Sequence, residues 1–146
     1  MTVGNLWLPT AEFTVTGQGY VPECEIQLNG NIVSVSSNPD LKQLILSAAL
    51  CSNARILPPN EENNRYQVLG DPTEACLEVV AQKAGFNVEI QNQNFPRLRE
   101  LPFDSSRKRM TTIHQLPCNK EGLKRIAYIK GAPKDVMELW ASSLSN

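Results

Sequence analysis

The 146-residue chain has little of what metal centres and most catalytic sites are built from. Its only histidine is His114, and its four cysteines include no Cys-x-x-Cys pair, so the spacing argues against zinc. Cys51 and Cys76 fall in apolar patterns of helical period, where a buried thiol is usual, and we expect a reducing cytosolic setting without a disulfide framework. Scattered serines with one histidine give no nucleophile triad. Gly17 and Gly19 lack the following Lys-Ser/Thr of a P-loop, and nucleotide binding of the P-loop or Rossmann kind is excluded.

Long apolar runs and a basic excess are also absent. The longest apolar-rich run, residues 44–50, is far shorter than the roughly 20 residues that a membrane-spanning helix needs. The N-terminus shows no signal-peptide pattern, so we expect a soluble chain. A net charge of −1 argues against a general nucleic-acid binder. The basic residues from Arg97 to Arg109 are a local cluster that Glu100 and Asp104 partly offset.

The composition, with 41% apolar and 20% charged residues, is that of one globular domain with a sizeable core. Hydrophobic periodicity predicts strands within residues 1–8 and at 12–16, 25–28, 66–69, 88–90, 97–103, 109–116 and 123–129. It predicts helices at residues 39–52 and 75–84 and from Pro133 through Trp140. Asn38 and Asp71 are natural N-caps, each followed by a proline at the first helical position, and Gly85 is a stop signal. Residues 56–64, which include two prolines, predict an exposed loop.

Residues 103–110 (FDSSRKRM) place an aromatic ring, two hydroxyls and three cations between two apolar runs. The ring of Phe103 offers a face for a flat base, and the cations that follow can donate charge-assisted hydrogen bonds to phosphate oxygens. This order suits a nucleotide that lies along a strand edge. An ordinary structural interpretation also fits, because an apolar residue that closes a strand before a charged turn is common in antiparallel sheets.

Two further segments have both a structural and a functional interpretation. In residues 70–74 (GDPTE), capping accounts for Asp71 and Pro72, and the helix dipole favours Glu74 in the first turn. A helix N-terminus beside a strand end is also suited to holding a ligand. Lys130, at a strand end before Gly131, is either solvated surface or part of a pocket that the glycine opens to close approach.

Together the three segments, residues 70–74, 103–111 (FDSSRKRMT) and 128–133 (YIKGAP), resemble the nucleotide-binding domain of P-type cation-transporting ATPases. The closest likeness is to the calcium-pump-like, type II branch, and it covers essentially the whole chain. It implies an α/β (α+β) fold with a twisted, mainly antiparallel sheet flanked by helices. It also implies that residues 1–146 form a single nucleotide-binding domain of a larger membrane ATPase.

The resemblance assigns roles to individual residues. Phe103 stacks on adenine, and Glu74 accepts a hydrogen bond from the adenine amino group with Thr73 beside it. Lys130 lines the floor of the adenine pocket, and Lys108 approaches the phosphates. The complete set of expected nucleotide-binding residues is Thr73, Glu74, Phe103, Ser105, Lys108, Met110, Lys130, Gly131 and Ala132, with Gly131 and Ala132 as close walls. No catalytic or metal-binding residue is expected.

The sequence also departs from the family pattern. Ser105 stands where calcium-pump relatives often carry an arginine. We therefore expect Lys108, Arg107 or Arg109 to contact the phosphates instead. A later family segment with an arginine is not in this sequence. Neither is the Asp-Lys-Thr-Gly-Thr motif of the phosphorylated aspartate, nor the magnesium-binding Gly-Asp-Gly-x-Asn-Asp segment. We therefore expect ATP binding without hydrolysis by this chain alone.

The resemblance implies a parent protein that is an ATP-hydrolysing cation translocase, with calcium transport as the nearest likeness. The expected ligands are ATP and ADP, with magnesium held mainly by other parts of the parent, and the expected partners are its phosphorylation and actuator domains. The expected place is the cytoplasmic face of a membrane, without direct insertion and without nucleic acid. The alternative is a stand-alone α/β interaction module whose basic face, residues 97–109, meets an acidic partner, and it predicts that Phe103 is buried core.

Overall fold

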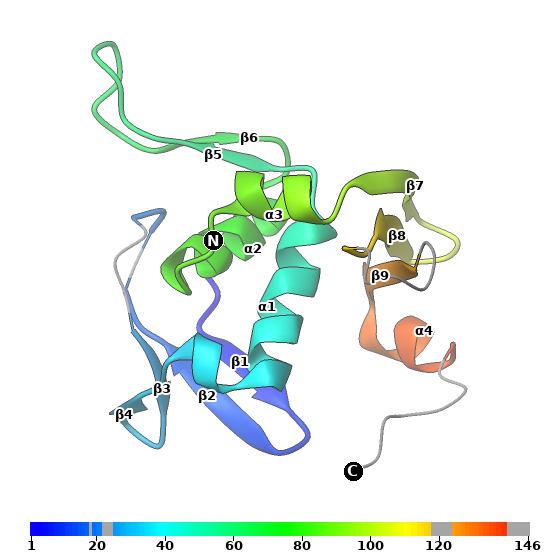
Figure 1. The fold of residues 1–146 in the computed structure, drawn as a ribbon. Helices are drawn as coiled ribbons and strands as arrows, with labels where there is room; N and C mark the ends of the chain where they lie inside the picture. Colours follow the sequence, from blue (N-terminus) through cyan, green and yellow to red (C-terminus); the bar gives the residue numbers. More distant parts are fainter. Residues whose placement is uncertain (18, 22–24, 118–123, 140–146) are drawn as a thin grey trace. The chain divides into compact units, whose positions relative to one another are not determined.

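The computed structural model describes residues 1–17, 19–21, 25–117 and 124–139 (Figure 1). The chain divides into two compact units, Met1–Gln91 and Asn92–Asn146, and each is described by itself. The mixture of helices with antiparallel strands confirms the predicted α/β (α+β) class, and the described strands are divided among three sheets. Among the described residues, no helix has the length and apolarity required to cross a bilayer.

The first unit begins with a four-stranded antiparallel sheet in the order β1-β2-β3-β4. Its strands are β1 (Asn5–Leu8), β2 (Ala11–Val15), β3 (Ile26–Leu28) and β4 (Asn31–Ile32). The alternation in β2 places Phe13 and Val15 in the core, because successive side chains of a strand point to opposite faces. The strands predicted at residues 12–16 and 25–28 are confirmed within one residue at each end.

Two capped helices complete the core of this unit. After a short 3₁₀ turn, η1 (Val35–Ser37), come α1 (Pro39–Leu50) and α2 (Pro72–Lys83). Asn38 Oδ1 accepts a hydrogen bond from the Leu41 N–H at 3.0 Å, as the predicted N-cap requires. Leu41 and Ile45 are fully buried and pack with β2 residues in one hydrophobic cluster. Figure 1 shows both helices beside the sheet.

A two-stranded hairpin, β5 (Arg55–Leu57) with β6 (Gln67–Leu69), lies against α2. The strand predicted at residues 66–69 is confirmed, but the loop predicted from residue 56 begins too early. Ile56 is buried with Ala54 and Val79, and this apolar contact keeps the segment in a strand until the two prolines. The exposed loop therefore begins at Pro58.

The strand predicted at residues 88–90 is wrong, because this segment is the first turn of helix α3 (Val88–Asn94). Asn87 Oδ1 accepts a hydrogen bond from the Ile90 N–H at 3.0 Å, which caps the helix. Val88 is buried and Ile90 is 49% exposed, so the two apolar residues do not share a buried strand face.

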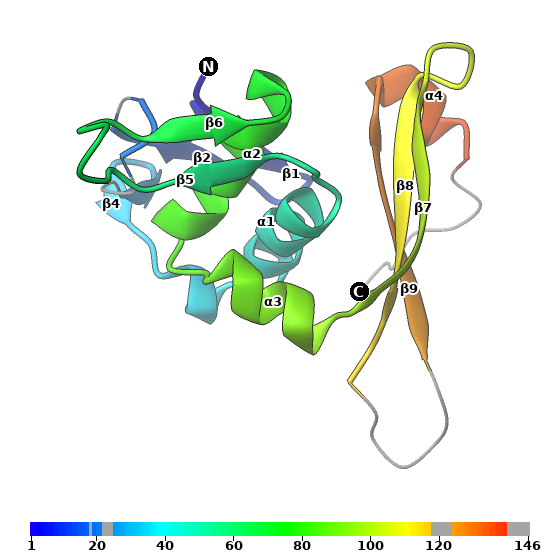
Figure 2. The ribbon, with the colours of Figure 1, turned by 90° about the horizontal axis from the view of Figure 1, so that it is seen from above.

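The second unit contains a three-stranded antiparallel sheet with β8 in the centre (Figure 2). Its elements are β7 (Arg97–Asp104), β8 (Arg109–Gln115), β9 (Arg125–Gly131) and the short helix α4 (Pro133–Met137). The three predicted strands are confirmed in the described residues. The last helix starts at Pro133 as predicted but ends at Met137, before Leu139. Trp140 lies outside the described residues.

Cys51 and Cys76 are both buried, as the helical pattern around them predicted. Cys24 and Cys118 lie outside the described residues.

Candidate nucleotide-binding site

The turn between β7 and β8 is shaped by one carboxylate. Asp104 Oδ1 accepts hydrogen bonds from the peptide N–H groups of Ser106, at 3.0 Å, and Arg107, at 2.9 Å, and from the Ser106 hydroxyl. These bonds, the Ser106 hydroxyl first and then the Arg107 N–H, hold the pKa of Asp104 below its usual range. The Lys108 N–H donates to the Asp104 carbonyl at 2.7 Å, and Lys108 closes the turn in the left-handed region at φ +51°.

The cations of this turn differ in what they contact. The Arg107 guanidinium donates to the Pro102 carbonyl at 2.9 Å, and Arg109 donates to the Arg107 carbonyl at 3.2 Å. The exposed Lys108 ammonium has no hydrogen-bond or ion-pair partner within the described part of the chain. Three cations are candidates for phosphate contact, and Lys108 is the one among them whose charged group does not donate to a backbone carbonyl of the turn.

Phe103 lies at a bulge in β7. The register of β7 on β8 shifts between Leu101 and Asp104, so Pro102 and Phe103 both lie opposite the single residue Met110. The Phe103 side chain is 63% exposed. This exposure contradicts the interpretation of Phe103 as buried core and leaves the ring able to stack on a planar ligand.

Met110 lies on the central strand, between Phe103 on one neighbouring strand and Lys130 on the other. Met110 is fully buried in β8 and pairs directly with Lys130 of β9. Paired residues on neighbouring strands share one face of a sheet, so Met110 and Lys130 lie side by side. Phe103, Met110 and Lys130 therefore come from the same level of three adjacent strands, and Lys130 is half-buried there.

Gly131 lies against the backbone of the β7–β8 turn. A Cβ atom at this position would stand 2.3 Å from the Lys108 carbonyl oxygen and 2.7 Å from Arg109 Cβ. The Ala132 N–H donates to the same carbonyl at 3.1 Å. The sequence predicted that this glycine permits the close approach of a ligand. The structure adds that the chain's own backbone needs the space, and the role of Gly131 and Ala132 as ligand walls stays a prediction.

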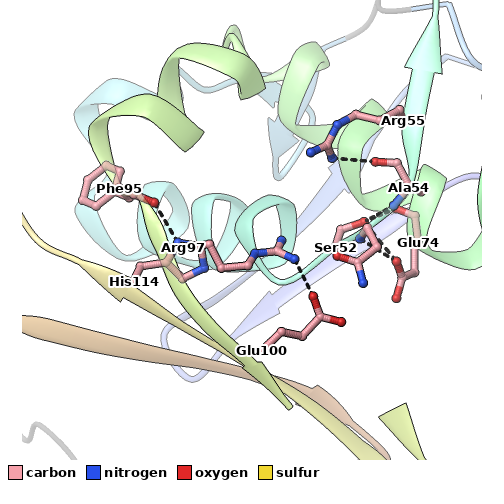
Figure 3. Close-up of polar contacts among 9 residues, drawn as sticks. Ser52, Ala54, Arg55, Glu74, Phe95, Arg97, Glu100 and His114 are labelled. Atoms are coloured by element: carbon pink, nitrogen blue, oxygen red, sulfur yellow. Dashed lines mark hydrogen bonds and ion pairs between the residues drawn. The ribbon is translucent and has the colours of Figure 1, made fainter. Parts of the chain in front are cut away.

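Thr73 and Glu74 lie in the first unit, at the N-terminus of α2. Asp71 Oδ1 accepts from the Thr73 N–H at 2.6 Å and from the Glu74 N–H at 3.3 Å, as the predicted cap requires. Glu74 Oε2 accepts from the Asn53 N–H at 2.7 Å and lies near the Ser52 hydroxyl (Figure 3). Glu74 thus holds the segment after α1 to the start of α2, while the Thr73 side chain is exposed.

The predicted site residues are therefore divided between the two units. Ser105, exposed in the β7–β8 turn, joins Phe103, Lys108, Met110, Lys130, Gly131 and Ala132 on the second unit. Thr73 and Glu74 belong to the first unit. That all of them contact one nucleotide stays a prediction.

Two ion pairs reduce the charge of the predicted basic face. Arg97 donates to Glu100 at 2.9 Å (Figure 3), and Arg107 lies 4.0 Å from Asp104. This agrees with the expectation that the two carboxylates partly offset the local basic cluster. The face at residues 97–109 is correspondingly less suited to an acidic partner.

Sequence reasoning missed the parts played by Asp104 and Asn53. An aspartate before two serines is a turn signal, because its carboxylate accepts from the N–H groups that follow, and this signal identifies Asp104. Asn53 has no such signal, because it meets Glu74 from 21 positions away in the sequence.

Comparison with known proteins shows the family. Residues 40–145 match the family described as "P-type ATPase, cytoplasmic domain N". This chain belongs to that family. The resemblance drawn from the three sequence segments is confirmed, and so is the predicted N-domain fold class.

Three of its relatives are calcium- or cation-transporting ATPases by name. The chain is 37% identical over 138 residues to "Calcium-transporting ATPase" of Bacillus subtilis (strain 168), which covers 94% of the chain and 15% of that protein. It is 34% identical over 145 residues to "Probable cation-transporting ATPase F" of Mycobacterium tuberculosis (strain ATCC 25618 / H37Rv), which covers 99% of the chain and 15% of that protein. It is 30% identical to "Calcium-transporting ATPase type 2C member 1" of Bos taurus over 126 residues, 85% of the chain and 12% of that protein. The chain thus spans about 15% of the length of the first two relatives.

Proposed function

We propose that this chain binds ATP through its adenine base and, within a parent cation-transporting ATPase, presents the γ-phosphate to an aspartate on a separate phosphorylation domain. The observation that carries this proposal is the exposed ring of Phe103, at 63%, on the strand next to buried Met110. An exposed aromatic ring on a strand next to an apolar residue suits a stacked base. Membership in the P-type ATPase N-domain family supports the choice of adenine nucleotide as ligand.

The polar residues have distinct roles in this proposal. Lys130 lines the floor of the base pocket, and Lys108, which has no described partner, meets the phosphates. Glu74 accepts from the adenine amino group, with Thr73 beside it. The Asn53 N–H holds the Glu74 carboxylate in place, and a group fixed before binding loses less conformational entropy when the ligand arrives.

The parent protein supplies the chemistry that this chain lacks. In our proposal its phosphorylation and actuator domains are the partners, its other domains hold most of the magnesium coordination, and the chain works at the cytoplasmic face of a membrane. The chain contributes proximity and orientation to phosphoryl transfer. By itself it binds ATP without hydrolysing it. Stacking with one or two hydrogen bonds supports about −4 to −5.5 kcal/mol, a Kd of about 1 mM to 0.1 mM.

The alternative, an interaction module with a basic face, is less well supported. It requires Phe103 in the core, whereas the ring is exposed. It also requires available cations along residues 97–109, where Arg97 and Arg107 face Glu100 and Asp104.

A nucleotide titration of the ¹⁵N-labelled chain tests the proposal. We expect ATP, ADP and AMP to shift the amide signals around Glu74, Phe103 and Lys130. GTP should shift them more weakly, because guanine carries a carbonyl oxygen at the ring position where adenine carries its amino group. The relative affinities of the three adenine nucleotides then measure what the phosphates add. If none of these amides moves at millimolar nucleotide while the spectrum is that of a folded chain, the proposal is wrong.

A further inference from the structure

A pocket lies wholly within the first unit, and none of the predicted nucleotide-binding residues lines it. It has a volume of about 660 Å³ and is formed by the β5–β6 hairpin, the C-terminal half of α2 and the start of α3. Figure 2 shows the hairpin running across α2. This volume is within the range of small-ligand sites. Its lining combines apolar side chains with two carboxylates, Glu78 and Glu89.

Glu78 is the unusual member of this pocket. Only 5% of the residue is exposed. Its Oε1 accepts from Gln82 Nε2 at 3.1 Å, one helical turn further on, but among the described residues nothing hydrogen-bonds to its Oε2. A buried carboxylate oxygen without a donor is unfavourable, so an incoming donor gains a strong interaction there.

The surroundings of Glu78 agree with this view. Burial raises the pKa of the Glu78 carboxyl, and the nearby Glu89 adds to the rise. Three groups lower this pKa: the Ile56 N–H, the Arg55 guanidinium and the Gln82 amide. The Ile56 N–H makes no hydrogen bond to Oε2. These groups therefore only partly replace the water that the carboxylate loses on folding.

The geometry selects the type of ligand. One Glu78 oxygen is already engaged by Gln82, so Glu78 itself offers one open oxygen, which suits a compact ammonium better than a guanidinium that binds both oxygens of one carboxylate. The lining holds two carboxylates and one guanidinium, that of Arg55, so its charge is balanced by one ammonium group rather than by a divalent cation. Leu57 and Leu69, at 39% and 53% exposure, add apolar surface on the hairpin side for an aliphatic stem.

We propose that this pocket binds a primary ammonium group at the end of an apolar stem, with Glu78 as the acceptor and Leu57 and Leu69 against the stem. Both a lysine side chain of a partner segment and a free alkylamine have this chemistry. The proposal does not depend on nucleotide binding, because the two sets of residues do not overlap.

The test uses n-butylammonium as the probe and n-butanol, which has the same stem without the charge, as the matched ligand. Titrated into the ¹⁵N-labelled chain, n-butylammonium should shift the amides of Ile56, Phe86 and Asn87 in a saturable manner, and n-butanol should not. Glu78→Gln should weaken binding of n-butylammonium about tenfold or more. Glu12→Gln, an exposed carboxylate on β2 outside the pocket, should leave binding unchanged.

Equal shifts with n-butanol, or unchanged affinity in a folded Glu78→Gln chain, would overturn the proposal. If that variant does not fold, Leu57→Ala on the exposed hairpin takes its place, and it should weaken n-butylammonium binding several-fold. Unchanged binding there would also count against the site. Comparing n-butylammonium with Nα-acetyl-lysine amide then assigns the source: tighter binding of the lysine derivative points to a partner segment, and the reverse order points to a small amine.

Discussion

Gly131 illustrates how one residue determines the join between β9 and the β7–β8 turn. Alanine here would place its Cβ 2.3 Å from a backbone carbonyl oxygen, which has no freedom to rotate away as a long side chain would. We expect Gly131→Ala to lower the free energy of unfolding by about 1–3 kcal/mol, in the range for overpacked sites. Urea unfolding measures this change.

Gly4→Ala is the matched control, because a Cβ at Gly4 meets nothing within 4 Å. The control should change stability little. If both substitutions have the same small effect, the close approach at Gly131 is not a constraint on the fold.

Glu78 predicts a pH dependence of stability. Its carboxyl has a pKa raised above the ordinary 4.5, so the folded chain binds this proton more tightly than the unfolded chain. The free energy of unfolding therefore falls as the pH rises from that ordinary value through the raised one. Glu78→Gln removes the titrating group, and we expect its stability relative to the wild type to increase between about pH 4 and about pH 7.

Unfolding by urea at both pH values measures the difference. Glu12→Gln serves again as the exposed control and should show no comparable gain. A Glu78→Gln chain whose stability difference from the wild type is the same at both pH values would contradict the assigned cause.

At the scale of elements, the β7–β8 hairpin depends on Asp104. Without its carboxylate, the N–H groups of Ser106 and Arg107 lose their acceptor. We expect Asp104→Ala to make the Lys108 amide, which donates to the Asp104 carbonyl, exchange its hydrogen several-fold faster, as hydrogen-exchange NMR detects. Asp104→Asn retains an acceptor oxygen and should show a smaller effect. Equal protection in all three chains would mean that the side chain does not shape the turn.

Asp104 should make the stability of this hairpin depend on pH with a sign opposite to that expected for Glu78. The pKa of Asp104 is lowered from its ordinary 3.8, so its contribution is present above that value and is lost as the pH falls through the lowered one.

Local chemistry predicted the helices that begin with a cap. Asn38 and Asp71, each followed by proline, fixed the starts of α1 and α2 because all the deciding atoms lie within one turn. The strand expected at residues 88–90 is wrong because three residues cannot distinguish a strand from the first turn of a helix, and the Asn87 cap favours the helix. The loop predicted from residue 56 is wrong at Ile56 because the contacts that bury this residue come from α2, which is distant in the sequence.

In the candidate site, too, local sequence signals predicted some residues, whereas others depend on contacts between distant parts of the chain. Sequence identified Phe103 and Lys130, and the register then placed both beside Met110. Two contacts depend on tertiary structure, that of Gly131 with the Lys108 carbonyl and that of Glu74 with Asn53, so no local sequence pattern predicts them.

At the scale of the whole molecule, the chain should bind ATP and leave it intact. It contains no Asp-Lys-Thr-Gly-Thr segment to accept a phosphoryl group. We expect no phosphate release above the no-protein blank, as a colorimetric phosphate assay measures. The affinity for ATP should change little when magnesium is replaced by EDTA, because the proposed contacts are mainly to the base. A strong magnesium requirement would contradict binding through adenine.

The most direct test of the central claim is the ATP affinity of Phe103→Ala against Leu98→Ala, measured by ¹⁵N NMR titration. Leu98 is a matched control, because it lies on the same strand at the other register shift and is also exposed, at 48%. Base stacking is worth about 1–3 kcal/mol, so Phe103→Ala should weaken ATP binding about fivefold or more, while Leu98→Ala should bind as the wild type does. If Phe103→Ala binds ATP as tightly as the wild type, the ring does not stack on adenine and the proposed site is wrong.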